Sequence, residues 1–120
     1  MDNLKIHFDD EEQVFSFIWD GKVSARDIIA SAEMGAIPEG CQRVICNHMH
    51  ADMIVDRKGY LEVADFFIKN KSIFENCRFA AIVDNPTTAA AYSLIIHQVN
   101  HRNYRLFSTE SAALRWLKEF

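Results

Sequence analysis

The sequence predicts a single α/β domain over residues 1–120, with a mixed five-stranded sheet and about four helices in the order ββαβαβαβα. Three observations lead to this fold class. Apolar and polar residues alternate near the N-terminus, short aliphatic runs recur along the chain, and amphipathic stretches with helix start signals stand between them. Strands that alternate with helices imply right-handed crossovers and a mostly parallel sheet, to which the first hairpin adds an antiparallel strand.

Composition and charge narrow the class of protein. The 120 residues are 49% hydrophobic and 25% charged, which is enough to bury one core and not two. The formal charge is -4 and the 13 Lys and Arg are scattered, so we expect no nucleic-acid partner. The N-terminus shows no targeting pattern, and the apolar runs are too short to span a bilayer. We therefore expect a cytoplasmic protein.

The three cysteines, Cys41, Cys46 and Cys77, are odd in number and have no CxxC spacing. They suggest neither a disulfide framework nor a zinc ribbon. We expect reduced thiols, with Cys46 and Cys77 in or beside strands as small hydrophobic residues.

The first three elements are a hairpin and a helix. Leu4, Ile6 and Phe8 alternate with polar residues, as in a strand with one buried face, and FDDEEQ follows as an acidic turn. The run VFSFIW at 14–19 predicts a second strand that ends at Asp20-Gly21. Ser24 is placed to cap the N–H of Asp27 at the start of the first helix, with Val23 and Ile28 as a hydrophobic staple, and Gly35 to end it.

The middle of the chain predicts two buried strands around a second helix. We expect a third strand at about 43–47, a polar loop after it, and then a helix whose core stripe is Tyr60, Val63, Ala64, Phe67 and Ile68. The fourth strand, RFAAIV at 78–83, has no polar residue after its first, as expected for a strand covered on both faces.

The last third predicts two helices around a short strand. Asn85 and Pro86 start the third helix, whose core stripe is Tyr92, Ile95, Ile96 and Val99. YRLFS forms the fifth strand, and Ser108 or Thr109 with Glu110 opens the terminal helix. The buried residues of this terminal helix are expected to be Ala113, Trp116, Leu117 and Phe120.

The order of elements, the segment VDRKGYLEVADFF and the tail LFSTESAALRWL together resemble the STAS or SpoIIAA-like family. The founding members of this family are bacterial anti-sigma-factor antagonists. The tail resembles that of small SpoIIAA-like proteins in which a short strand leads into a helix with an Ala-Leu-x-Trp-Leu pattern. The resemblance in topology covers nearly the whole chain.

The resemblance implies where a function would lie. In the anti-sigma-factor antagonists, the loop after the third strand carries Asp-Ser-Ser-Gly, and a partner kinase phosphorylates a serine there. The matching residues here are Asp56, Arg57, Lys58 and Gly59, so both hydroxyls are missing. We expect no phosphate between Asp56 and Gly59, with the basic residues facing solvent. What the resemblance carries over is the loop as a candidate interaction surface for a protein partner.

The same loop has the residue types of a metal site. His48 and His50 can chelate from one side of an extended segment, with Asp52 or Asp56 completing a zinc set. HxH also recurs by chance in loops, and neither HExxH nor a paired CxxC supports a metal here. We expect no cofactor, and His48 and His50 as solvated imidazoles that titrate near the usual value of about 6.5.

Two further positions are candidates for binding. His97 and His101 share a helix face with Ala90 and Leu94, and we place a contact with a second copy of the chain ahead of a metal there. Asp84 and Asn85 follow the fourth strand, at the end of a sheet where ligands bind in open α/β folds. The simpler interpretation makes Asn85 a helix cap and Asp84 a turn residue.

Catalytic motifs are lacking: no serine lies in a G-x-S-x-G setting, and the four glycines form no phosphate loop. Two hypotheses remain. The first is a non-catalytic, STAS-like interaction domain without the serine switch, acting through 48–59 and the second helix. The second is a ligand-binding protein or minor enzyme with a pocket between 48–56 and 84–88. A concave pocket joining those segments favours the second hypothesis, and a flat loop with an exposed apolar rim favours the first.

Overall fold

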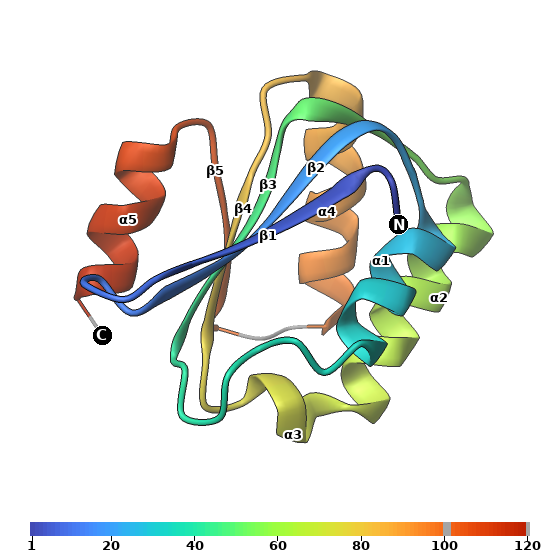
Figure 1. Ribbon diagram of the computed structural model, residues 1–120. Helices are drawn as coiled ribbons and strands as arrows, with labels where there is room; N and C mark the ends of the chain where they lie inside the picture. Colours follow the sequence, from blue (N-terminus) through green and yellow to red (C-terminus); the bar gives the residue numbers. More distant parts are fainter. Residues whose placement is uncertain (100–101, 120) are drawn as a thin grey trace.

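A computed structural model describes residues 1–99 and 102–119, and its elements follow the predicted order (Figure 1). The four predicted helices and five predicted strands are present, and α3 adds a single turn between α2 and β4. The elements are β1 (Leu4–Asp9), β2 (Val14–Ser24), α1 (Ala25–Glu33), β3 (Arg43–Ile54), α2 (Arg57–Lys69), α3 (Lys71–Phe74), β4 (Arg78–Ile82), α4 (Pro86–Val99), β5 (Tyr104–Phe107) and α5 (Glu110–Lys118). Among the described residues, no helix is both long and apolar enough to cross a membrane.

The strands lie in the sheet in the order in which they occur in the chain, from β1 to β5. β1 is antiparallel to β2, and every later neighbour is parallel. Figure 1 shows α1, α2 and α4 on one face of the sheet and α5 on the other. Because each parallel crossover advances the sheet by one strand in the same direction, right-handed connections place these three helices on one face. The predicted mixed α/β sheet is confirmed.

Each face of the sheet has its own hydrophobic core. The larger core lies under α1, α2 and α4. On the other face, the buried residues of α5 pack against sheet residues that include Ile45, Ala80 and Ile82. In β4, the four residues after Arg78 are each at most 4% exposed, so this strand is covered on both faces as its apolar sequence predicted.

Three predicted helix starts are present with their hydrogen bonds. Ser24 and Asp27 form a reciprocal capping box at α1, and the bond from the Ser24 N–H lowers the pKa of the Asp27 carboxyl. Asn85 Oδ1 accepts from the Thr88 N–H at 2.8 Å at the start of α4. Thr109, one of the two predicted caps of α5, accepts from the Ala112 N–H.

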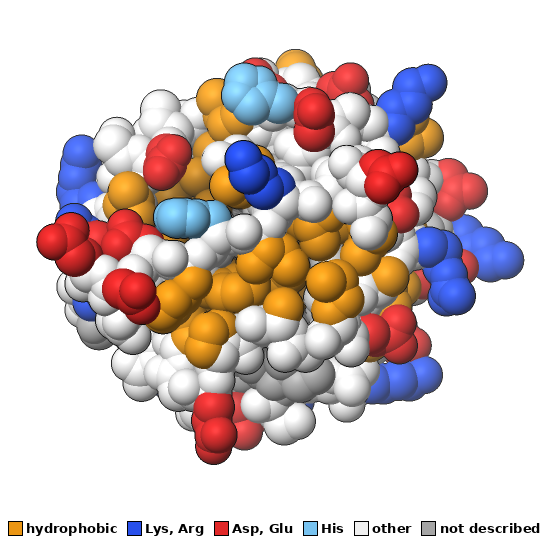
Figure 2. Space-filling view, in the orientation of Figure 1, with side chains coloured by type: hydrophobic (Ala, Val, Ile, Leu, Met, Phe, Trp, Pro, Cys, Tyr) orange, Lys and Arg blue, Asp and Glu red, His pale blue; other side chains and the backbone are white. Residues whose placement is uncertain are grey.

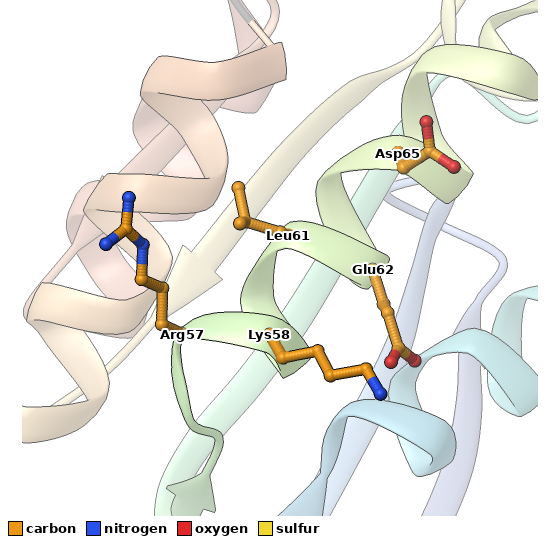
Figure 3. Close-up of a pocket in the computed structure, with 5 residues that line it drawn as sticks. All are labelled: Arg57, Lys58, Leu61, Glu62 and Asp65. Atoms are coloured by element: carbon orange, nitrogen blue, oxygen red, sulfur yellow. The ribbon is translucent and has the colours of Figure 1, made fainter.

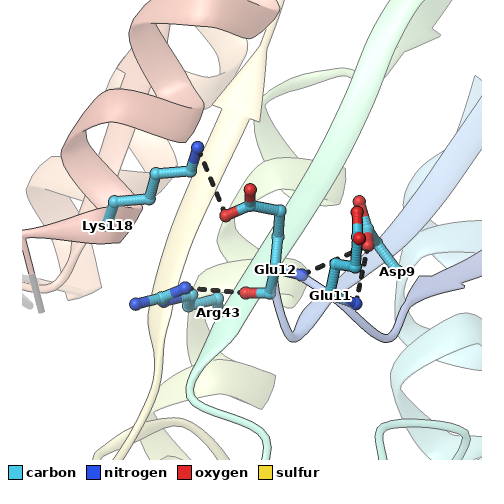
Figure 4. Close-up of polar contacts among 5 residues, drawn as sticks. All are labelled: Asp9, Glu11, Glu12, Arg43 and Lys118. Carbon is cyan, nitrogen blue, oxygen red and sulfur yellow. Dashed lines mark hydrogen bonds and ion pairs between the residues drawn. The ribbon is translucent and has the colours of Figure 1, made fainter.

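The acidic turn between β1 and β2 is tied to two distant elements (Figure 4). Asp9 Oδ1 accepts the N–H groups of Glu11 and Glu12 at 3.0 and 3.2 Å, which closes the turn. Arg43 donates to the Glu12 carbonyl, and Lys118 forms an ion pair with the Glu12 carboxylate at 3.2 Å. The turn therefore contacts the start of β3 and the end of α5.

Two strands are longer than predicted. β2 was expected to end at Asp20-Gly21 and β3 at about residue 47, but the two strands remain paired as far as Ser24 and Ile54. The reason is that Val23, Ala51 and Met53 are at most 4% exposed and extend the apolar face of the sheet under the helices. Most of the segment predicted as a polar loop is therefore strand.

Trp116 is expected to stabilise the fold. It is 7% exposed, packs against the Phe107 ring at 5.5 Å between centroids and lies under the Arg78 guanidinium at 4.8 Å. We predict that Trp116→Ala lowers the free energy of unfolding by about 3–5 kcal/mol, because it removes a large buried side chain. Urea denaturation measures this loss. Arg115→Ala is the matched control, since Arg115 is exposed on the same helix and its loss should change stability by less than about 0.5 kcal/mol.

Candidate functional site

A β-bulge in β3 places the residues of the candidate site. Ile18 lies opposite Asn47 and Asp20 lies opposite His50, so Trp19 alone faces both His48 and Met49. The extra residue reverses the alternation of the strand. His48 keeps the phase of Val44 and Cys46, so it points into the core beneath the helices and is 0% exposed, while Met49 joins the core on the α5 face. After the bulge, the reversed alternation turns Ala51 and Met53 toward the helices. The Asn47 side chain accepts the Met49 N–H at 2.9 Å within the bulge.

The prediction that His48 is a solvated imidazole is wrong. Its Nε2 lies 2.5 Å from the Tyr92 hydroxyl oxygen, and the Trp19 ring stacks on it with centroids 6.1 Å apart. Burial lowers the pKa of His48 to about 3, because a charged imidazole would lose its hydration in this core. His48 is therefore neutral at physiological pH. Its Nδ1 is a buried nitrogen without a hydrogen-bond partner in the described part of the chain.

The other loop candidates do not converge with His48. His50 and Asp52 are exposed, and Asp56 caps α2 by accepting the Gly59 N–H at 2.7 Å. Asn85 Nδ2 donates to Asp52 Oδ1 at 3.1 Å, so the structure brings together two predicted residues 33 positions apart. Within residues 1–99 and 102–119, no three His, Cys, Asp or Glu side chains are placed to hold a metal ion.

A hollow of about 620 Å³ lies between the end of β3 and the start of α4. Its lining comes from the two segments that the sequence grouped together, residues 52–56 and 85–88, whereas exposed Asp84 does not line it. The side chains of Asp52, Asp56, Asn85 and Thr88 in this lining already have partners within the chain. Besides the capping bonds of Asp56 and Asn85, Thr88 Oγ1 accepts the Met53 N–H at 3.1 Å. These atoms hold the ends of two helices and a strand in place.

The first turn of α2 is exposed, as predicted for Arg57 and Lys58. Figure 3 shows Arg57 and Leu61 on the side of α2 nearer α4, whereas Lys58 and Glu62 lie on the side nearer α1. Gly59, by contrast, is buried and faces the start of α1. In this turn, Arg57 and Lys58 are therefore open to solvent, whereas Gly59 is a buried packing position.

Large apolar side chains are exposed on α2, on α4 and at the end of β3. Leu61 and Ile68 on α2 are 41% and 45% exposed, Leu94 on α4 is 46% exposed, and Ile54 at the end of β3 is 55% exposed. We call Leu61, Ile68 and Leu94 the α2–α4 surface; Ile54 is separate from it, because it alternates with Met53 along β3 and so points to the opposite face of the sheet. The placement of Ile68 in the core stripe of α2 is therefore wrong. Leu94 and His97 are both exposed, so the helix face that they share is open, whereas His101 and Phe120 lie outside the described residues.

Sequence reasoning missed Leu61, Ile54 and the Tyr92 partner of His48. Leu61 lies seven positions before Ile68, which is a helical spacing on one face, and this signal could have grouped the two residues. The contact of Tyr92 with His48 spans 44 positions and has no local signal.

Comparison with known proteins agrees with the fold. A crystal structure of an uncharacterized protein from the DUF3478 family, from Shewanella loihica PV-4, superposes with a TM-score of 0.58 and 15% sequence identity. The match covers 95% of this chain and 91% of that chain, which is described as having a SpoIIAA-like fold. This chain has a SpoIIAA-like fold. No protein-family model matches the sequence, and no curated protein matches it at a significant level.

The buried His48 predicts a loss of stability in acid. Its pKa is about 3 in the folded chain and about 6.5 when unfolded, so the unfolded state binds the proton first as the pH falls. The contribution of neutral His48 is complete above pH 6.5 and is lost between about pH 6.5 and 3, by roughly 1.4 kcal/mol per pH unit. Urea denaturation at several pH values should show a smaller acid loss for His48→Gln. Exposed His97→Gln is the control and should follow the wild type; equal slopes for both variants would contradict the assignment.

Gly59 gives a second prediction at this site. An added Cβ would lie 2.8 Å from Val55 Cγ1 and 3.3 Å from the Ala25 Cβ. Alanine usually stabilises a helix relative to glycine by about 1 kcal/mol. Here we expect Gly59→Ala to destabilise the chain by about 1–3 kcal/mol, because α2 would be pushed away from α1. Thermal denaturation tests the sign, and an increase in melting temperature would show that the contact relaxes without cost.

Proposed function

We propose that this chain is a non-catalytic regulatory domain that binds a protein partner through the α2–α4 surface. One observation carries the proposal: Leu61, Ile68 and Leu94 are each more than 40% exposed on two helices, α2 and α4, that pack against each other. Large apolar side chains clustered at a surface, with charged residues around them, are typical of protein interfaces. The charged residues here include Arg57, Lys58, Glu62 and Asp65.

The fold supports the same location. In the anti-sigma-factor antagonists that the sequence resembles, the segment between the third strand and the following helix carries the regulatory serine. The matching segment here leads into the α2–α4 surface and presents Arg57 and Lys58 to solvent. Since these residues cannot accept a phosphate as serine does, recognition at this turn depends on two fixed positive charges rather than on a phosphorylated hydroxyl.

Burial of the reactive side chains supports a non-catalytic role. Burial raises the pKa of the Cys46 thiol to about 12, so almost no nucleophilic thiolate is present at neutral pH. His48 is neutral and fully enclosed by the core, and no substrate can reach it without opening the fold.

The hollow between residues 52–56 and 85–88 supports a second candidate, binding of a small ligand. A concave pocket joining these two segments is the feature that this alternative requires. The alternative is weaker because the Asp56, Asn85 and Thr88 oxygens are engaged in capping and strand contacts, which a ligand would have to replace. A stoichiometric ligand that co-purifies with the chain and is displaced by Thr87→Trp would favour it.

The proposal predicts that Leu61→Ser weakens partner binding at least tenfold without unfolding the chain. Leu61 is 41% exposed, so its loss should change the melting temperature of the chain little. The same substitution removes a central apolar side chain from the proposed interface with the partner. Affinity capture from the native cell, followed by titration of the purified partner, should show at least a tenfold weaker complex. Met34→Ser is the matched control, because Met34 is 51% exposed near the end of α1. A partner that binds both variants equally would exclude the α2–α4 surface.

A further inference from the structure

β1 forms one edge of the sheet, and part of its backbone points away from the rest of the chain. Among the described residues it pairs with β2 only. The Asp20 N–H donates to the Asn3 carbonyl at 2.9 Å, and hydrogen-bonded pairs alternate along an antiparallel ladder. The outward-facing backbone groups therefore belong to the even-numbered residues of the strand. The Leu4 N–H already donates to the Met1 carbonyl at 3.4 Å, so the groups that remain for pairing are those of Ile6 and Phe8.

This edge also has an apolar side. Ile6 is 38% exposed, and Leu4 and Phe8 are half-buried against the larger core beside α1. Figure 2 shows hydrophobic side chains gathered on this face of the molecule, along β1 and toward α1. Natural edge strands are commonly protected by prolines, bulges or covering segments. The six residues of β1 contain no proline, and the register with β2 has no bulge.

We propose that β1 pairs with β1 of a second copy of this chain, antiparallel and about a twofold axis at His7. Outward-facing groups of one strand must meet outward-facing groups of the other, which restricts the register to pairs of even-numbered residues. An axis at His7 satisfies this condition, because Ile6 then faces Phe8 of the second copy and each such pair exchanges two hydrogen bonds. The apolar side chains of both copies lie on the helix-covered face of a continuous sheet.

Charge complementarity selects the same register. With the axis at His7, Lys5 lies directly opposite Asp9 of the second copy, and the pair occurs twice. Two backbone N–H groups hold the Asp9 carboxylate in place (Figure 4), and directly opposed opposite charges stabilise paired strands. If the axis is moved to Ile6, even-numbered residues still face even-numbered residues and the hydrogen bonds can form, but Lys5 then lies opposite His7. That register loses both attractive pairs.

The edge pairing does not depend on the proposed partner binding. β1 lies at the edge of the sheet beyond α1, whereas the α2–α4 surface lies on α2 and α4. Substitutions in β1 therefore leave Leu61 and its neighbours unchanged. A second copy bound at β1 leaves the α2–α4 surface open to a different protein.

A disulfide across the twofold axis tests the register. Two residues at position 7 form a non-hydrogen-bonded pair with Cα atoms about 4.5 Å apart, which is within disulfide range. Mild oxidation of His7→Cys should convert most of the protein to a dimer that reducing agent separates on a denaturing gel. Lys5→Cys is the matched control and should remain monomeric on that gel, because the two copies of position 5 are about 13 Å apart along the strands. Equal cross-linking of both variants would overturn the register.

Sedimentation equilibrium tests the dimer itself. Wild-type protein should approach twice its chain mass of 13.8 kDa as its concentration rises. Ile6→Pro should sediment as a monomer, because proline removes an outward-facing N–H without breaking a bond to β2. Circular dichroism shows whether Ile6→Pro is still folded. If proline disturbs the strand, the His7→Cys cross-link still tests the dimer. A wild-type chain that stays monomeric at millimolar concentration, or a dimer that survives in folded Ile6→Pro, would overturn the proposal.

Discussion

The long parallel pairing of β2 with β3 is the contact on which the rest of the structure depends. It joins Val14–Ser24 to Arg43–Ile54 and carries the apolar side chains of both cores. The end of β2 leads directly into the capping box of α1, and only two residues separate the end of β3 from the start of α2. If the pairing stopped at Asp20, as the sequence suggested, α1 and α2 would lack the part of the sheet that carries the buried side chains of Val23 and Met53. The positions of these two helices relative to the sheet would then not be fixed.

Much of this fold could be predicted because its signals are local. A serine three residues before an aspartate, an asparagine before a proline, and apolar residues at helical spacing in the tail each describe bonds within a few positions of the chain. The structure contains each of these features, at Ser24, Asn85 and Trp116. The strands β1 and β4 could be predicted for the same reason. Alternating apolar residues in β1 indicate one buried face, and the uninterrupted apolar run of β4 indicates two.

The candidate site was less predictable because its arrangement depends on one inserted residue. His50, Ala51, Asp52 and Met53 alternate as a strand should, but the bulge at His48 and Met49 shifts this pattern out of phase with the preceding residues. Read without the shift, the segment looks like a polar loop. Composition also gives no indication that His48 faces Trp19 and Tyr92 rather than solvent, because these contacts join different elements. Arg57 and Lys58 were placed correctly, since charged residues in a first helical turn rarely have room to be buried.

The order of the strands has a consequence for synthesis on the ribosome. Each strand pairs with the one made just before it, so the sheet can extend in step with the emerging chain and few contacts have to wait for distant segments. The exception is α5, which follows the whole sheet in the chain and covers Ile45, Ala80 and Ile82. Until that helix leaves the exit tunnel, an almost complete sheet presents a bare apolar face to solvent. A nascent chain of this design is most exposed to aggregation in the interval between the synthesis of β5 and the release of α5 from the tunnel.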